Sequence, residues 1–452
     1  MIQALRNWWR SLDVYADPRV RGMLFLGFAS GLPFPLVLTT LSARLRLAGI
    51  DRTTIGMFSL VGLAYSLKYF WSPIVDRMPL PGLRGLGRRR SWMLLAQIGI
   101  VAGLVMLAAA DPAVDAQKVA LLAVFTAFCS STQDIAVDAW RIEVAGAEAQ
   151  GAMAAAYQIG YQVALITAGA GALVAASGYG WSTAYLIMAA CGCIGIATTL
   201  LVREPATGID RAALSNEPLV AGFLASSTGW PAPLRNIGAW LVGAVVCPFA
   251  DFFARFGLRV GLPILLLVVT YRLNYTTMGV AANTFYLDMG FTLDQIAVVS
   301  KVYGVVMTML GAVAAGLLIR RLGIPRTLLA GCLLLTGANL VYAHMASIHP
   351  GIAWLATAVS ADNVANGIAG TAFIAYMSSL TSPAYTATQY ALFGTLWSLP
   401  AKSIASQWGR IVDAWGYPPF FVYTAAIGLP SLLLVLWLVR RDARARKEAA
   451  AT

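Results

Sequence analysis

Residues 121–140, LLAVFTAFCSSTQDIAVDAW, decide the class of fold. The segment has the length and the apolar first half of a membrane span, yet Asp134 and Asp138 lie in its second half. A charge at the bilayer centre costs roughly 2.5–3.5 kcal/mol on insertion scales, so such residues usually face a protein interior or a water-filled path. Their i, i+4 spacing places both carboxylates on one helical face. This pattern is typical of proteins that move a solute or a proton.

The composition indicates a polytopic membrane protein. Hydrophobic residues make up 59% of the 452-residue chain and charged residues only 12%, whereas a soluble domain carries about 25% charged residues. Twelve apolar stretches have the length of about 20 residues that a transmembrane helix needs. They predict an all-α membrane protein with 12 transmembrane helices, arranged as two six-helix halves. The predicted order is an amphipathic lead-in (1–21), an N-terminal bundle (22–202), a cytoplasmic linker (203–257), a C-terminal bundle (258–440) and a basic tail (441–452).

The basic residues predict the orientation. Lys and Arg gather in alternate loops and at both ends of the chain, with a dense run at residues 88–90. By the positive-inside rule this side is cytoplasmic. The protein is therefore expected in a bacterial inner membrane with both termini in the cytoplasm. The net charge of +12 is then largely a signal of topology. A nucleic-acid partner is not expected, because the arginines are scattered over many loops.

Two readings of residues 235–256 are open. The segment is apolar but contains Pro248, Asp251 and Arg255. An amphipathic helix on the cytoplasmic leaflet is favoured, since one additional span would invert the second half and contradict its arginines.

Several polar residues inside the N-terminal spans are candidates for transport. Lys68 lies near the middle of the second span and is the expected partner of Asp134, in a transport site or in a purely structural ion pair. Asp138 either pairs with Arg77 or Arg141 as part of a cytoplasmic latch or touches solute. Gln133 can read a sugar or peptide group or join two helices. In the fifth span, Tyr157, Gln158 and Tyr161 form an aromatic and amide stripe that suits a sugar, or packs as ordinary core.

The C-terminal spans offer a second set. Arg272 near mid-membrane can clamp a carboxylate through two parallel hydrogen bonds, and Asp362 is either a proton site or a fixed counter-ion. Asp134, Asp138 and Asp362 are therefore the candidate proton-coupling residues. The remaining candidates for solute contact are Asn274, Tyr275, Lys301, Asn363, Asn366 and Lys402.

The sequence contains no recognisable catalytic grouping and no phosphate-binding GxxxxGK[ST] loop, so neither an enzyme nor an ATP-driven pump is expected. The five cysteines lack zinc spacing and are expected to be reduced thiols. No metal or cofactor is predicted. An ion gradient is the simplest energy source, and buried carboxylates suit protons.

The loop after the second span, SPIVDRMPLPGLRGLGRRR, resembles the loop signature of the major facilitator superfamily. In that family an Asp at a helix end pairs with loop arginines and latches the cytoplasmic side. The resemblance maps the latch onto Asp76, Arg77 and the arginine run at residues 88–90, of which Arg88 is the chosen candidate. Arg141 is added to the latch as a candidate partner of Asp138. The matching loop of the second half, GLLIRRLGIPR, lacks the Asp.

A closer resemblance is to the AmpG-type muropeptide permease family. It is carried by SLVGLAYSLKYFWSPIVDR, GRRRSWMLLAQ and STQDIAVDAW, strongly over residues 22–205 and more weakly to about residue 440. The resemblance implies proton-coupled import of N-acetylglucosaminyl-1,6-anhydro-N-acetylmuramyl peptides through the Gram-negative inner membrane for cell-wall recycling. It also implies a link to β-lactamase induction, and such folds usually act as monomers. The rival interpretations are a facilitator of another solute, such as a drug exporter or acyl-CoA carrier, and a membrane sensor that transports nothing.

Overall fold

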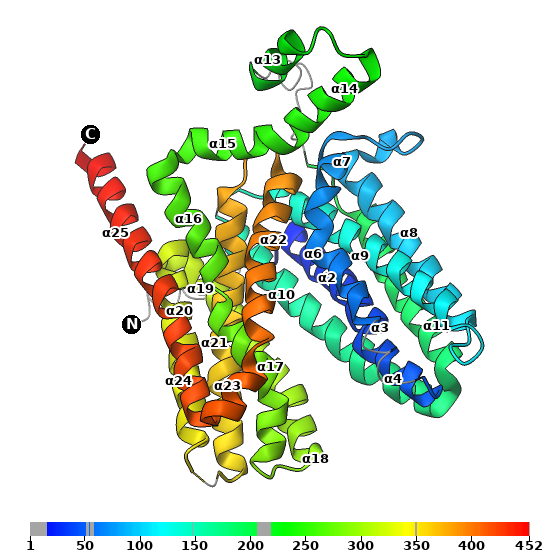
Figure 1. The fold of residues 1–452 in the computed structure, drawn as a ribbon, viewed down its shortest axis with the longest axis vertical. Helices are drawn as coiled ribbons and strands as arrows, with labels where there is room; N and C mark the ends of the chain where they lie inside the picture. Colours follow the sequence, from blue (N-terminus) through cyan, green and yellow to red (C-terminus); the bar gives the residue numbers. More distant parts are fainter. Residues whose placement is uncertain are drawn as a thin grey trace.

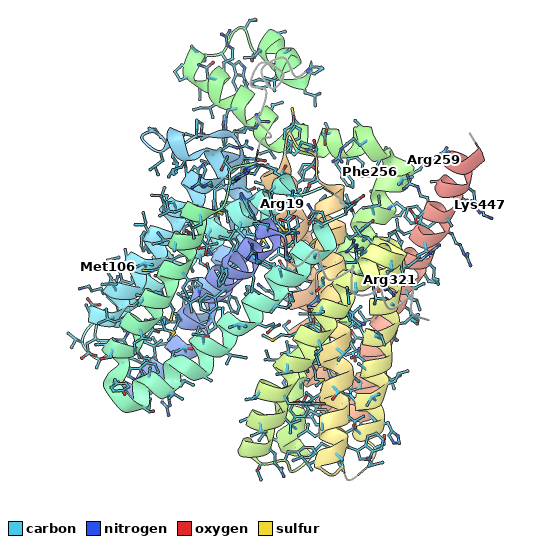
Figure 2. All side chains as sticks on the ribbon, turned by 180° about the vertical axis from the view of Figure 1, so that it is seen from behind. Arg19, Met106, Phe256, Arg259, Arg321 and Lys447 are labelled. Atoms are coloured by element: carbon cyan, nitrogen blue, oxygen red, sulfur yellow. The ribbon has the colours of Figure 1, made fainter. Side chains whose placement is uncertain are left out.

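The computed structural model describes residues 16–50, 54, 58–146, 148–205, 218–348 and 350–451, and every regular element in these residues is helical. The helices form two bundles, which Figure 1 shows meeting near α7, α15 and α22 and diverging toward α4 and α18. The reverse view in Figure 2 shows the same divergence.

The N-terminal bundle contains the elements up to residue 201. They are α2 (Pro18–Gly31), α3 (Pro33–Val37), α4 (Thr39–Leu47), η2 (Ser59–Gly62), α6 (Leu63–Leu67), η3 (Lys68–Phe70), α7 (Ser72–Arg77), η4 (Arg84–Leu86), α8 (Arg88–Ala109), α9 (Ala116–Val144), α10 (Gln150–Ile166), η5 (Thr167–Gly171) and α11 (Ala172–Leu201). A linker follows, with α13 (Pro218–Ser226), α14 (Ala232–Leu241), η6 (Val242–Val246) and α15 (Cys247–Phe256). In Figure 1, α15 runs across the end of the C-terminal bundle, and α13 and α14 project beyond it.

The C-terminal bundle contains the elements from residue 258 onward. They are α16 (Leu258–Thr270), α17 (Leu273–Asp288), α18 (Leu293–Ile296), η7 (Ala297–Tyr303), α19 (Gly304–Leu322), α20 (Ile324–Met345), α21 (Ile352–Leu380), α22 (Thr386–Ala405), α23 (Trp408–Trp415), α24 (Tyr417–Ile427) and α25 (Leu429–Ala451). Each bundle has its own apolar core, with Leu36 and Leu104 in the first and Leu267 and Leu328 in the second.

Eight helices among the described residues are long and apolar enough to cross a membrane. One of them, Gln150–Leu201, has 52 residues and is interrupted at Gly180, whose φ of 81° suits glycine. With its two arms taken separately, the eight account for nine of the twelve predicted spans. The other three, near 54–77, 352–380 and 385–412, fold as helices that are more polar or broken into short segments, so hydropathy alone does not establish the count of twelve.

In the described residues the bundles are joined mainly by two sets of helix contacts. The first is α22, which packs on α6, α7 and α9 of the N-terminal bundle, and the second is α10, which packs on α19 and α21. We call the end of the molecule at α7 and α15 the basic end. Figure 2 shows Arg19, Arg259, Arg321 and Lys447 in this half of the molecule.

Candidate functional site

A buried charge cluster lies at the basic end. Asp76, at the end of α7, accepts a hydrogen bond from the Arg89 guanidinium at 2.7 Å. Glu143, near the end of α9, receives the same guanidinium at 2.5 Å and lies 3.5 Å from Arg88. Arg89 and Asp76 are almost wholly buried. Burying a charge is tolerated when it is paired and hydrogen-bonded, so the cluster joins α7, α8 and α9.

The cluster continues into the other bundle. The second carboxylate oxygen of Asp76 accepts from the backbone N–H of Thr388 at 3.1 Å and from its hydroxyl at 3.0 Å. Thr388 is in the first turn of α22, where backbone N–H groups have no partner within the helix and the dipole favours an anion. Arg141 adds a second link, because it donates to the Ser378 hydroxyl at 2.7 Å and lies over the Tyr390 ring at 5.1 Å. The basic ends of the bundles are therefore joined by charged groups.

The predicted latch residues contribute differently to this cluster. Asp76 and Arg141 bridge the bundles, and Arg88 donates to the backbone carbonyl of Asp76. Arg77 turns instead to the linker, where it donates to the Gly243 carbonyl and lies over the Tyr385 ring. Glu143 was not predicted, and Arg89 was predicted only as a member of the arginine run, from which Arg88 was chosen. The run of three arginines at residues 88–90 was the signal in the sequence. Which of the three points into the bundle depends on the residue at which α8 begins, and the sequence does not show that residue.

In the middle of the N-terminal bundle, the expected Lys68–Asp134 ion pair is not the one found. The Lys68 ammonium lies 3.6 Å from Asp138, and Arg141 lies 3.3 Å from the other oxygen of Asp138. Residues 68–70 form a 3₁₀ turn between two short α-helices. The direction of the Lys68 side chain therefore differs from the one expected for a continuous α-helix. Asp134 is left with one buried oxygen that has no hydrogen-bond partner.

The other N-terminal candidates divide into packed and accessible groups. The Gln133 amide is 1% exposed and lies 3.4 Å from the Ser30 hydroxyl, which favours the reading of a helix–helix contact. Tyr157 and Tyr161 share a face of α10, with ring centroids 5.9 Å apart, and both are half-buried, as is Gln158.

In the C-terminal bundle, Arg272 is the centre of the predicted set. Its guanidinium donates to Asn366 at 3.0 Å and lies over the Tyr275 ring at 4.5 Å. The described residues place no carboxylate within 4.0 Å of it, and one buried oxygen of Asp362 has no hydrogen-bond partner. A planar guanidinium held by an amide and a ring is suited to a carboxylate ligand.

The remaining predicted residues have varied surroundings. Asn363 joins α19 and α21 through Thr308 at 2.8 Å, and Asn274 is buried with its oxygen on the Tyr275 N–H. Lys402 crosses to the other bundle and donates to the Ser66 hydroxyl at 2.7 Å. The side chain of Lys301 lies outside the described residues.

Two helical bundles with buried charges between them have the architecture of a secondary transporter. Comparison with known proteins agrees: residues 22–401 match the Major Facilitator Superfamily. The anhydromuropeptide permease of Escherichia coli (strain K12) is 34% identical over 427 residues, which cover 94% of this chain and 80% of that protein. The putative transporter AmpG 4 of Rickettsia felis is 31% identical over 435 residues, covering 95% of this chain and 98% of that protein.

The chain belongs to the Major Facilitator Superfamily and, within it, to the AmpG-type anhydromuropeptide permeases, as the sequence predicted. Solved structures agree on the fold. FucP in its outward conformation aligns with a TM-score of 0.64 at 13% identity, covering 94% of this chain and 99% of that one. The proton:xylose symporter XylE aligns with a TM-score of 0.61 at 12% identity, covering 95% and 96%. The family and fold are those of a membrane transporter and not of an enzyme.

Proposed function

We propose that this protein imports GlcNAc-1,6-anhydroMurNAc peptides through the bacterial inner membrane for cell-wall recycling. The observation that carries the proposal is the near full-length similarity to a protein named anhydromuropeptide permease. The half-buried tyrosines of α10 and the Arg272 guanidinium are consistent with a solute that has both sugar rings and carboxylates. Import would also supply the cytoplasmic signal for β-lactamase induction in bacteria that use it.

The proposed orientation puts the basic end and both termini in the cytoplasm. In that orientation the structure is outward-facing, which means that the bundles separate toward the periplasm. They are joined at the basic end and diverge at the other (Figure 1). Solute enters between the bundles from the periplasm, and rocking of the two bundles opens the basic end. The unit of transport in this proposal is the monomer.

The proton is assigned to Asp134 or Asp362 in preference to Asp138. Both oxygens of Asp138 lie near cations, Lys68 and Arg141. Asp134 and Asp362 each have a buried oxygen without a hydrogen-bond partner. Burying an unpaired charge is costly, and taking up a proton removes that cost. A proton on either residue would favour reorientation of the loaded carrier and would leave on the cytoplasmic side.

For the solute, we propose that Arg272 binds peptide carboxylates and that Tyr157 and Tyr161 stack on the sugars. The residues proposed to complete the solute site are Lys68, Gln133, Gln158, Asn274, Tyr275, Lys301, Asn363, Asn366 and Lys402. Gln133 and Asn363 already serve helix contacts in this conformation, so their part in solute binding depends on rearrangement.

The test is uptake of radiolabelled anhydromuropeptide into right-side-out vesicles, with and without a proton gradient, for the wild type and Asp134→Asn. We expect the wild type to concentrate the solute only with the gradient, and the variant to bind it without concentrating it. Uptake unchanged in the variant would move the proton to Asp362, tested by Asp362→Asn in the same assay. No uptake by the wild type under any gradient would overturn the muropeptide assignment in favour of another solute.

A further inference from the structure

A groove opens beside the N-terminal bundle at the basic end, away from the transport residues. It has a volume of about 1030 Å³ and lies between the start of α2 and the end of α11, with the end of α9 behind it. Its apolar part is exposed: Phe25 is 49% and Leu201 84% accessible. Since α2 and α11 both belong to candidate spans, we expect these side chains to face the acyl chains of the membrane.

Three arginines, Arg19, Arg21 and Arg203, line the polar end of the same groove. Arg19 already has partners, because its guanidinium pairs with Asp17 at 2.7 Å and donates to the Val144 carbonyl at 3.1 Å. Arg21 and Arg203 are exposed, and the described part of the chain gives their side chains no hydrogen bond or ion pair. Two positive charges without an ion pair in the described residues therefore lie at the depth where lipid headgroups are expected.

The acidic residues that line the groove are already occupied. Hydrogen bonds from Arg19 hold the pKa of the Asp17 carboxyl below its ordinary value, so Asp17 stays ionised and paired. Glu143 receives Arg89 and Arg88, as described above. Glu204 accepts the backbone N–H groups of Arg89 at 2.8 Å and Arg90 at 3.0 Å, at the start of α8. The groove thus presents surplus positive charge to a ligand.

We propose that this groove binds one anionic phospholipid of the cytoplasmic leaflet. The phosphate of the headgroup lies between Arg21 and Arg203, and an acyl chain lies along Phe25, Ile194 and Leu201. Basic pockets between transmembrane helices on the cytoplasmic side are suited to such headgroups. A free phosphate would leave the apolar half of the groove unused, and a zwitterionic lipid would bring an amine for which no unpaired carboxylate lines the groove.

The occupant is identified by a photoreactive benzoyl-phenylalanine in place of Phe25, in the full-length protein in native membranes. Illumination and mass spectrometry are expected to find a phospholipid joined to residue 25. A crosslink to residues 1–15 of the same chain, or to a second protein, would mean that the groove binds protein and would overturn the proposal.

The charge requirement is tested by titrating the purified protein with phosphatidylglycerol and counting bound lipids by native mass spectrometry. Arg21→Gln combined with Arg203→Gln is expected to weaken binding about 30-fold, which is about 2 kcal/mol for two arginines near an anionic lipid. The matched control is Arg259→Gln with Lys447→Gln, which removes two exposed charges elsewhere at the basic end (Figure 2) and is expected to leave binding unchanged.

Three outcomes would contradict the lipid site. They are equal binding by both double variants, equal affinity of the wild type for phosphatidylcholine with the same chains, and displacement of the lipid by glycerol phosphate at similar concentration. The last would indicate a site for small anions. In the described residues the side chains of Arg21 and Arg203 make no hydrogen bond or ion pair, and Arg21 has only a longer-range attraction to Asp17, so the double variant is expected to stay close to the wild-type melting temperature. The readout is lipid binding, so it stands apart from the identity of the transported solute.

Discussion

At the scale of single residues, Arg272 has the most distinctive surroundings. Its guanidinium is held by Asn366 and by the Tyr275 ring, and the described residues place no carboxylate within 4.0 Å of it. Arg272→Lys keeps the charge but loses the planar fork and the stacking, which do not survive exchange for an ammonium. We expect about tenfold weaker binding of anhydromuropeptide, roughly 1.4 kcal/mol, measured by equilibrium binding to the purified protein.

The control for Arg272 is the same ligand with its peptide carboxylates amidated. The wild type and Arg272→Lys are expected to bind this neutral ligand equally. If the variant loses affinity for both ligands to the same extent, Arg272 maintains the shape of the site and does not recognise carboxylates.

The identity of many polar residues in the spans was predictable, whereas their pairing was not. Asp134, Asp138 and Lys68 stand out because charge is rare in apolar segments. Which carboxylate receives Lys68 depends on a 3₁₀ turn that hydropathy does not reveal. Likewise, residues 88–90 are all arginine, and only the start of α8 after Gly87 decides that Arg89 points inward.

At the scale of helices, α2 and α10 approach closely because glycines line their contact. A Cβ atom at Gly160 would overlap the backbone carbonyl of Leu24, which cannot move independently of its helix. Gly160→Ala is therefore expected to destabilise the protein by about 1–3 kcal/mol through overpacking. The measurement is the fraction of detergent-solubilised protein that remains monodisperse after heating.

Gly169→Ala is the matched control for Gly160→Ala. It lies nine residues further along the same span, and a Cβ atom there meets nothing within 4 Å. We expect a melting temperature close to that of the wild type for Gly169→Ala and a clear decrease for Gly160→Ala. Equal melting temperatures for the two variants would show that the helices separate at little cost.

The contact of α7 with α22 gives a second prediction at this scale. Asp76→Asn removes the ion pair with Arg89 while keeping a group that can accept from Thr388. Hydrogen bonds to charged groups contribute about 1.5–3 kcal/mol, so the basic end is expected to open more often. Ala387 is 1% exposed, and Ala387→Cys, in a background without the native cysteines, reports this opening by its rate of reaction with a maleimide.

Labelling at position 387 is expected to be several-fold faster in inside-out vesicles when Asp76→Asn is present. Asp413→Asn is the control, because Asp413 is an exposed carboxylate on α23, far from α7. An unchanged labelling rate in Asp76→Asn would show that the charge cluster does not hold the basic end closed.

Whole helices were predictable to different degrees. The most apolar spans, such as α8 and the one that contains α19, follow directly from hydropathy. The segment 58–77 and helices α21 and α22 were predicted as spans but are less apolar or broken into short segments, because they exchange apolar residues for polar groups, some of which join the bundles. Three of the spans beside the proposed transport path are therefore the ones that hydropathy identifies least well, whereas α9, α10 and α16 in the same path are identified by hydropathy.

At the scale of the whole molecule, alternating access requires that contacts between the bundles break during each cycle. Thr395 of α22 donates to the backbone carbonyl of Ser66 in α6 at 2.9 Å, so these positions are in contact across the two bundles. In a background without the native cysteines, Ser66→Cys with Thr395→Cys is expected to form a disulfide that holds the bundles together here. Oxidation is then expected to stop uptake of anhydromuropeptide into right-side-out vesicles, and reduction to restore it.

Binding from the outside is expected to survive this oxidation, because the opposite ends of the bundles remain apart (Figure 1). The control keeps Cys332 and adds Ser431→Cys. The Cys332 Sγ and Ser431 Oγ atoms are 3.4 Å apart, and they join α20 and α25 of a single bundle. Its disulfide is expected to leave uptake unchanged, because neither helix has to leave the other when the bundles rock. Uptake that continues at the wild-type rate in the fully oxidised Ser66→Cys and Thr395→Cys protein would rule out separation of α6 from α22 as a step of transport.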